Sequence, residues 1–200
     1  MSHMGWQPPK LTGRSSTFLS GGVVLLIIAA IVVSALMDRE GGPVSILIPG
    51  DPFPPYAATS LDGTEVPISD FRGTPVLLNF WATWCSSCVD QLSEMQLLRE
   101  ELEGQGLEII TVNLDGEDRT GVSELWEQWG FGWLNLFDDP DRVEEVFAWG
   151  SRYPKTVLVN EDGTVGVWWQ GQLDLRLPEN RAIIEEAISG KAVWTPGSSG

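Results

Sequence analysis

The feature that most constrains the fold is a buried strand that runs directly into a pair of cysteines and then into an amphipathic helix. The apolar run at 75–78 follows a Gly-Thr turn and is typical of a strand buried on both faces. Beyond the cysteines, apolar residues recur at steps of three and four until Gly104, which predicts a helix over about 86–103. Cys85 is therefore expected at the helix N-terminus, with Cys88 one turn further on.

This placement favours a reactive sulfur at Cys85. The thiolate is the form that attacks a disulfide, and the unpaired N–H groups and dipole of a helix N-terminus stabilise its negative charge. Cysteines so placed have pKa values of roughly 3.5–7.5 instead of about 8.5. Cys88 is expected on the inner face of the helix, where it can attack a mixed disulfide at Cys85 and release the reduced partner. The spacing thus predicts Cys85 as the nucleophile and Cys88 as the resolving thiol.

Three other roles for the cysteine pair compete with this one. A zinc site needs two further ligands, but the chain has no third cysteine, and its one histidine, His3, belongs to a polar N-terminal stretch. A purely structural disulfide would close so small a loop that it would constrain the unfolded chain little. Two inert core thiols would be unusual beside Trp84 in a strand-to-helix turn. A redox pair suits this setting better than any of the three.

The remaining pattern from 56 to 190 predicts an α/β domain. Two short strands at 56–60 and 65–68 are typical of a hairpin closed by an Asp-Gly turn. A second central strand at 107–113 is separated from the first by the crossover helix, so the two should be parallel. The other predicted elements are a helix over about 122–129, a short strand at 133–137, a helix from Pro140 to about Trp149, a hairpin spanning 156–170, and a helix from Pro178 to Gly190.

A membrane anchor is predicted near the start of the chain. Residues 18–37 carry no charge and are numerous enough to cross a bilayer as a helix. Lys10 and Arg14 precede this run, so the positive-inside rule predicts a cytoplasmic tail at 1–17 and an exported remainder. The alternative is a cleaved signal peptide, because the small residues at 33–35 resemble a cleavage site. The length of the apolar run favours a retained single-pass anchor in the cell membrane.

Composition bounds the environment of the exported part. All 28 acidic residues of the 200-residue chain follow the anchor, against ten Lys and Arg, which makes the formal charge of this part −18. Such a charge disfavours nucleic acid and anionic lipid as partners. The Gly- and Pro-rich stretch at 38–55 is predicted to be a tether, and residues 191–200 a loose tail. An exported compartment permits disulfide chemistry, but one cysteine pair suits catalysis better than a disulfide-stapled scaffold.

Several motifs in this order resemble the thioredoxin superfamily, and specifically its membrane-anchored TlpA/ResA-like thiol-disulfide oxidoreductases with their redoxin or AhpC/TSA-like domain. The resemblance covers about 49–188. Its motifs are Leu-Asn-Phe-Trp-Ala-Thr-Trp-Cys at 78–85 together with Cys88, Leu-Asp-Gly at 61–63, Phe-Arg-Gly-Thr-Pro at 71–75, and Tyr-Pro-Lys-Thr at 153–156.

The resemblance implies a thioredoxin-like fold, with a central mixed sheet flanked by helices and an N-terminal β-hairpin extension. It implies no cofactor besides a redox-active disulfide between Cys85 and Cys88. It also implies that a cis peptide bond precedes Pro154, which faces the cysteines, and that Tyr153 offers backbone hydrogen bonds to an extended substrate strand. Trp84 should flank the exposed sulfur, either as a substrate contact or as filler of the core.

The sequence departs from the family where protons are handled. Thioredoxin has a buried aspartate six residues before the first cysteine, and Asn79 stands there in this chain. ResA-like members often have a glutamate three residues after the second cysteine, and Gln91 stands there. Neither usual proton acceptor for Cys88 is present, which leaves Asp90, Glu94 or water as substitutes. The redox potential, and with it the direction of electron flow, does not follow from the sequence.

The function expected from these features is an extracytoplasmic, membrane-tethered thiol-disulfide oxidoreductase. Its partners would be the thiols and disulfides of exported proteins, with apocytochrome c as one candidate, and a membrane thiol donor would keep it reduced. Two alternatives are a peroxiredoxin-like peroxidase and a redox-inert binding or adaptor module, such as a metallochaperone. The paired cysteine spacing argues against the first, and the lack of histidine after the anchor argues against metal delivery.

Overall fold

The computed structural model describes residues 28–29, 45–116 and 118–193. The chain divides into two units, Met1–Glu40 and Gly41–Gly200. Ile28 and Ala29 are the part of the first unit that is described, and both are helical. Four predicted segments lie wholly or partly outside the described residues: the cytoplasmic tail at 1–17, most of the anchor at 18–37, the first part of the tether at 38–55, and most of the C-terminal tail at 191–200. Within the described ranges, no helix has the length and hydropathy needed to span a membrane.

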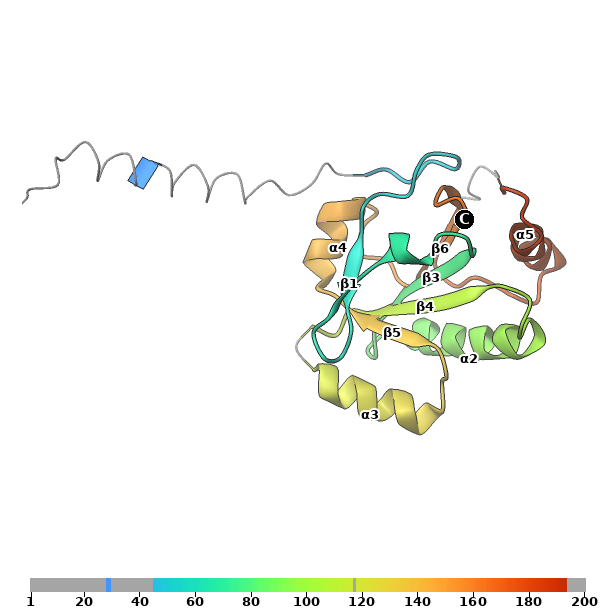
Figure 1. Cartoon of the computed structure of the whole chain (residues 1–200). Coiled ribbons are helices and arrows are strands. Elements are labelled where there is room, and N and C mark those ends of the chain that lie inside the picture. The colour runs from blue at the N-terminus through green and yellow to red at the C-terminus, as the bar shows by residue number, and fades with distance from the viewer. Residues whose placement is uncertain (1–27, 30–44, 117, 194–200) are drawn as a thin grey trace, which may run out of the picture. The chain divides into compact units, whose positions relative to one another are not determined.

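In the described part of the second unit, the strands form one seven-stranded sheet in the order β2-β1-β5-β4-β3-β6-β7 (Figure 1). The sheet is mixed, because β4 runs parallel to β3 and to β5 whereas the other pairs are antiparallel. The strands are β1 (Ala57–Thr59), β2 (Glu65–Pro67), β3 (Val76–Trp81), β4 (Glu108–Asn113), β5 (Leu134–Phe137), β6 (Lys155–Val159) and β7 (Val165–Gln170). The predicted N-terminal hairpin and the predicted parallel pair of central strands are both confirmed.

Helices cover both faces of this sheet, and β3 lies between two cores. Leu77 and Trp81 belong to the core beneath α2, α3 and α5, whereas Leu78 and Phe80 belong to the core beneath α4. All six residues of β3 are buried, as expected for a strand covered on both sides. The helices are α2 (Ser86–Glu101), α3 (Arg119–Trp129), α4 (Pro140–Phe147) and α5 (Pro178–Ile188), with a 3₁₀ turn η1 (Ile68–Phe71).

Two helix boundaries differ from the predicted ones because of local caps. Helix α3 begins at Arg119, since the side chain of Asp118 accepts the N–H of Gly121 and so caps the first turn. Helix α4 ends at Phe147, because Ala148 adopts a left-handed conformation with φ 46°. Trp149 thereby turns back and stacks on Phe147 with ring centroids 4.5 Å apart. The loop that follows leads to β6 and the predicted cis proline.

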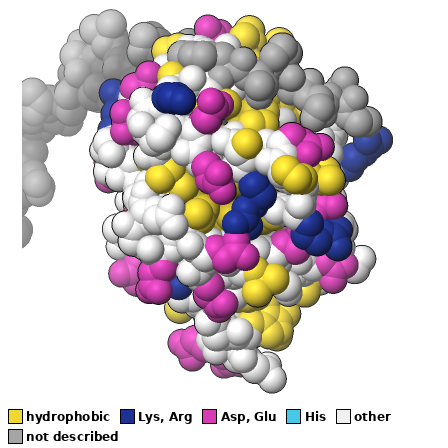
Figure 2. All heavy atoms as spheres, turned by 90° about the vertical axis from the view of Figure 1, so that its right-hand side faces the viewer, with side chains coloured by type: hydrophobic (Ala, Val, Ile, Leu, Met, Phe, Trp, Pro, Cys, Tyr) yellow, Lys and Arg dark blue, Asp and Glu magenta, His cyan; other side chains and the backbone are white. Residues whose placement is uncertain are grey.

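Acidic side chains are dispersed over the face formed by α2 and α5. Figure 2 shows acidic, basic and small hydrophobic groups mixed on this side of the molecule. Arg181 pairs with Glu101, and Arg176 pairs with Asp174 at 2.9 Å. The charges on this face therefore form a solvated, mixed surface rather than one acidic block.

Candidate active site

The structure places both cysteines at the start of α2. Cys85 is the N-cap residue, with φ −102° and ψ 98°, and its own N–H donates to the carbonyl of Ala82 at 3.2 Å. Its carbonyl accepts the N–H groups of Cys88 at 3.0 Å and Val89 at 3.2 Å. The side chain of Cys85 makes no cap hydrogen bond to the helix. The predicted position of Cys85 at the helix N-terminus is confirmed.

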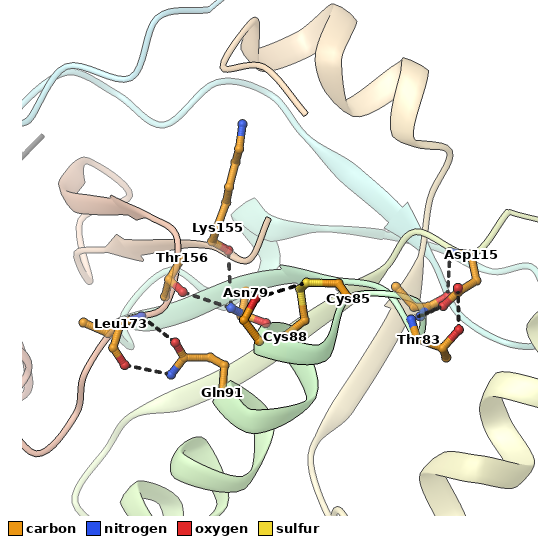
Figure 3. The surroundings of a disulfide bond; sticks show 11 residues. Asn79, Thr83, Cys85, Cys88, Gln91, Asp115, Lys155, Thr156 and Leu173 are labelled. Atoms are coloured by element: carbon orange, nitrogen blue, oxygen red, sulfur yellow. Dashed lines mark hydrogen bonds between the residues drawn. A yellow bond between two sulfur atoms is a disulfide. The ribbon is translucent and has the colours of Figure 1, made fainter. Parts of the chain in front are cut away.

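Cys85 and Cys88 are joined by a disulfide, with their Cα atoms 5.2 Å apart (Figure 3). Cys88 is completely buried, whereas Cys85 keeps 9% of its surface exposed. The first cysteine is thus less open than the exposed sulfur expected from the sequence. The hydroxyl of Ser87 lies 3.6 Å from its sulfur. Because solvent reaches Cys85 and not Cys88, the asymmetry favours the roles predicted for the two sulfurs.

Trp84, which directly precedes Cys85, meets Tyr153 from a different connection of the chain. The Tyr153–Pro154 peptide bond is cis, as the resemblance implies. The rings of Trp84 and Tyr153 meet edge to face, with centroids 6.3 Å apart. Trp84 is 65% exposed, so the alternative in which it fills the core is wrong. Burial, with Glu144 and Asp141 nearby, raises the pKa of Tyr153 to about 12 and keeps its hydroxyl neutral.

The backbone on the two sides of the cis bond differs in its hydrogen bonding. The carbonyl of Pro154 is already occupied, because it accepts the N–H of Gly171 at 2.8 Å. Within the residues that the structure describes, no hydrogen bond is seen at the backbone N–H or C=O of Tyr153. These two groups are therefore available for the backbone pairing with a substrate strand that the sequence predicts.

Asn79 and Gln91, which stand at the family's two acid positions, act as ties between elements. The amide nitrogen of Asn79 donates to the hydroxyl of Thr156 at 2.9 Å and to the carbonyl of Lys155 at 3.4 Å, joining β3 to β6 (Figure 3). The amide of Gln91 donates to the carbonyl of Leu173 at 3.0 Å and accepts its N–H at 2.5 Å. Both side chains are fully buried, and neither amide can take a proton from Cys88 at neutral pH.

The two carboxylates proposed as substitutes lie elsewhere on α2. Asp90 is exposed on the helix surface. Glu94 accepts the N–H of Leu175 at 3.3 Å and lies 3.8 Å from Arg176, so its oxygens already have partners. Among the described residues, no side-chain carboxylate is bonded to Cys88. Neither of the two carboxylates named from the sequence is therefore a hydrogen-bond partner of the resolving thiol in the disulfide form.

The comparisons with known proteins agree with this geometry. The AhpC/TSA family model matches residues 49–167, which is more than half of the chain. The chain belongs to the AhpC/TSA family. It is similar to the thiol-disulfide oxidoreductase ResA of Geobacillus thermodenitrificans, with 32% identity over 145 residues that cover 72% of this chain and 80% of the relative. ResA of Bacillus subtilis is 29% identical over 148 residues, covering 74% and 81%.

Solved structures support the same fold. A putative thiol:disulfide interchange protein DsbE from Chlorobium tepidum superposes with a TM-score of 0.63 at 24% identity, covering 71% of this chain and 99% of that one. The ResA-like chain is therefore a thiol-disulfide oxidoreductase with a thioredoxin-like fold.

Sequence reasoning missed Lys155, a buried charge beside the cis proline of this ResA-like protein. Its ammonium group donates to the carbonyls of Trp149 and Gly150 and lies 4.8 Å from the Trp149 ring centroid. Burial lowers the pKa of Lys155 to about 8. Figure 3 shows the side chain pointing away from the disulfide, so Lys155 holds the loop before Pro154 rather than contacting a sulfur. A lysine next to the predicted cis proline, just before the apolar run at 157–159, was the signal available.

The cavity beside η1 does not coincide with the disulfide. Within the described ranges, no three metal-ligating side chains of His, Cys, Asp or Glu cluster together. A cavity of about 230 Å³ lies between η1, the N-terminal lead-in and the end of β6, with Phe53, Phe71 and Val159 in its lining. Neither cysteine lines it, so the chemistry of the site is that of the disulfide and its rim.

Proposed function

We propose that this oxidoreductase is tethered to the cell membrane, faces the extracytoplasmic side, and reduces disulfides in exported proteins. The observation that carries the proposal is the unequal exposure of the two disulfide-bonded cysteines, together with the contact between Trp84, which directly precedes Cys85, and Tyr153 of the cis Tyr153–Pro154 bond. Cys85 keeps 9% of its surface exposed at a helix N-terminus, while Cys88, one turn further on, is completely buried. A sulfur that attacks and a sulfur that resolves need this arrangement.

The exchange would proceed in two steps. The Cys85 thiolate attacks one sulfur of a substrate disulfide, which forms a mixed disulfide and expels the other substrate sulfur as a thiolate. Cys88 then gives up its proton and attacks the sulfur of Cys85, which forms the Cys85–Cys88 disulfide and expels the second substrate sulfur. The two expelled thiolates take up protons, so the substrate gains two electrons and two protons. A membrane thiol donor would reverse these steps on the enzyme and restore the dithiol.

The docking mode proposed for the substrate is an extended strand beside the disulfide. The free backbone groups of Tyr153 would hold the strand, and the exposed ring of Trp84 would cover one of its side chains. In this mode the enzyme recognises the backbone of the substrate more than its side chains. Such recognition suits an enzyme that acts on several exported proteins. Reduction of cysteine pairs in apocytochrome c before haem attachment is the specific role that we propose first.

The proposed location rests on sequence features alone. The uncharged run at 18–37, preceded by Lys10 and Arg14, supports a retained anchor. The acidic character of everything after the anchor supports an aqueous, exported domain with protein partners. Membrane fractionation of the full chain, with protease added from the outside, tests both points. The domain is proposed to face the periplasm or the cell exterior, so the protease is added to cells from which any outer membrane has been removed. A domain that is released without detergent, or that is protected from protease in such cells, contradicts the proposal.

Trapping tests the activity and the partner together. A Cys88→Ser variant should retain its natural partner on Cys85 as a stable mixed disulfide that survives without reductant. A Cys85→Ser variant is the matched control and should trap nothing. Capture of exported proteins with cysteine pairs supports the proposal, whereas consumption of peroxide by Cys88→Ser with no trapped protein favours the peroxidase alternative. A cellular function that persists in a Cys85→Ala/Cys88→Ala double variant favours the adaptor alternative.

The direction of electron flow needs a separate measurement. Equilibration of the Cys85–Cys88 pair with a glutathione series should yield a potential well below that of strong oxidants such as DsbA at about −120 mV. A value close to that of DsbA would overturn the reductant assignment and leave the exchange chemistry intact.

A further inference from the structure

Asp115 holds the connection between β3 and α2 from the end of the neighbouring strand β4. Its carboxylate accepts the N–H of Thr83 at 2.9 Å and the hydroxyl of Thr83 at 2.7 Å (Figure 3). Asn113, the last residue of β4, fixes the carboxylate in turn. The Nδ2 of Asn113 donates to Asp115 at 2.5 Å, and its Oδ1 accepts the N–H of Asp115 at 3.0 Å. The hydrogen bonds to Asn113 therefore fix the orientation in which the Asp115 carboxylate accepts from Thr83.

The residue that Asp115 holds lies two positions before the attacking sulfur. Three residues, Ala82 to Trp84, separate the end of β3 from Cys85. One end of this connection is fixed by the sheet, and the N–H of Cys85 returns to the carbonyl of Ala82. With Thr83 held as well, the backbone has little freedom before the first turn of α2. Trp84, between the held residue and the sulfur, is restrained at the same time.

We infer that Asp115 is a positioning residue for Cys85, which keeps the sulfur over the N–H groups that begin α2 and keeps the Trp84 ring against Tyr153. Asp115 acts through Thr83. A loosened connection would let the sulfur move off the helix N-terminus, where N–H groups and dipole stabilise a thiolate. The inference rests on the proposed function in one respect, which is that Cys85 is the attacking sulfur.

Charge alone would act in the opposite direction, and this makes the inference testable. A carboxylate near Cys85 repels a thiolate, so removal of its charge with the connection intact should lower the pKa of Cys85 or leave it unchanged. Removal of the hydrogen bonds that Asp115 makes to Thr83 should instead raise the pKa of Cys85. An amide can replace the carboxylate geometrically, because its oxygen accepts the Thr83 N–H and its NH₂ donates to the hydroxyl oxygen of Thr83.

The experiment compares Asp115→Asn, Asp115→Ala and Thr83→Val in the full chain. The exposed Glu108, at the opposite end of β4, provides the matched control Glu108→Ala. The pKa of Cys85 is measured from the pH dependence of its alkylation, with the modified residue identified by mass spectrometry. KM and kcat are measured for the reduction of a protein disulfide. The melting temperature is recorded for each variant.

We expect Asp115→Ala to raise the pKa of Cys85 by about one unit, which is a tenfold loss of thiolate at a pH below both pKa values, and to raise KM. Thr83→Val should shift the pKa less in the same direction, because it keeps the N–H contact. Asp115→Asn should behave as wild type or have a lower pKa. Equal downward shifts in Asp115→Ala and Asp115→Asn, or a change in melting temperature alone, would overturn the inference. If wild-type Cys85 titrates like free cysteine, the proposed function fails instead.

Discussion

Gln91→Glu tests how the structure uses the position at which ResA-like members often have an acid. Gln91 is fully buried on α2, and its amide is matched to both backbone groups of Leu173. The substitution keeps the size of the side chain but replaces the donating nitrogen with an oxygen. The introduced carboxyl can satisfy the Leu173 carbonyl only while it is protonated, because an ionised carboxylate has no donor.

The free energy of unfolding of Gln91→Glu should decrease, relative to wild type, as the pH rises. Burial and the facing carbonyl both favour the neutral acid, so the pKa of the introduced carboxyl should exceed its ordinary value of about 4.3. Because each unit corresponds to about 1.4 kcal/mol, a rise of about two to three units removes about 3–4 kcal/mol from the free energy of unfolding once the carboxyl is ionised. With a folded pKa above the unfolded one, stability is retained below about pH 4.3 and lost as the pH rises through the folded value.

The assay is urea unfolding of the oxidised protein at about pH 4 and about pH 8, at which the introduced carboxyl is mostly neutral and mostly ionised. Gln91→Met is the matched control, because it keeps the volume but loses both hydrogen bonds to Leu173 at every pH. We expect Gln91→Glu to resemble wild type at the lower pH and to be clearly less stable at the higher one. The reasoning is refuted if its deficit is the same at both pH values, or if no deficit is present at about pH 8.

Two further predictions concern the loop before the cis proline and the rim of the site. Because burial lowers the pKa of Lys155 from 10.5 to about 8, the native protein loses this proton before the unfolded chain does, and stability from this group rises with pH across that window. The stability of wild type relative to Lys155→Met should therefore grow by up to ~1.4 kcal/mol per pH unit, and a constant difference in urea unfolding would contradict this. Since Trp84 is 65% exposed, Trp84→Ala should change the free energy of unfolding by less than ~0.5 kcal/mol but raise KM several-fold for a protein disulfide. A small disulfide substrate is the control, and an unchanged KM for the protein substrate would remove Trp84 from the docking site.

The parts of the fold that local sequence determines were predictable. The strand at β3 and the helix at α2 follow from a buried apolar run and a helical period, and both cysteines lie where these two patterns place them. Boundaries were less accurate where a cap decides them. Ala148 ends α4 through a left-handed backbone, which alanine adopts rarely and which no sequence rule assigns to it.

The contacts that position the site were not predictable, because they join residues distant in sequence. Thr83 and Asp115 are 32 positions apart, and Gln91 and Leu173 are 82 apart. In the sequence, Asp115 is one acid of a loop, and Gln91 is one polar residue in an amphipathic helix. Their roles appear only when the sheet places the end of β4 beside the end of β3, and when the chain after β7 returns to α2.

Together these contacts indicate how the site functions with amides at the two acid positions. Asn79 ties β3 to β6 next to the cis proline, and Gln91 ties α2 to the chain after β7, so each amide stabilises the frame around Cys88. A buried acid at either position would couple this frame to pH, whereas an amide keeps it constant. Electron transfer in this protein should therefore be governed by the acidity of Cys85, which depends on the α2 N-terminus and the connection that Asp115 holds. Its rate should follow the pKa of Cys85 over the neutral range. A further ionisation that persists in Lys155→Met, in which the nearby buried lysine is removed, would show that Cys88 has an acid partner after all.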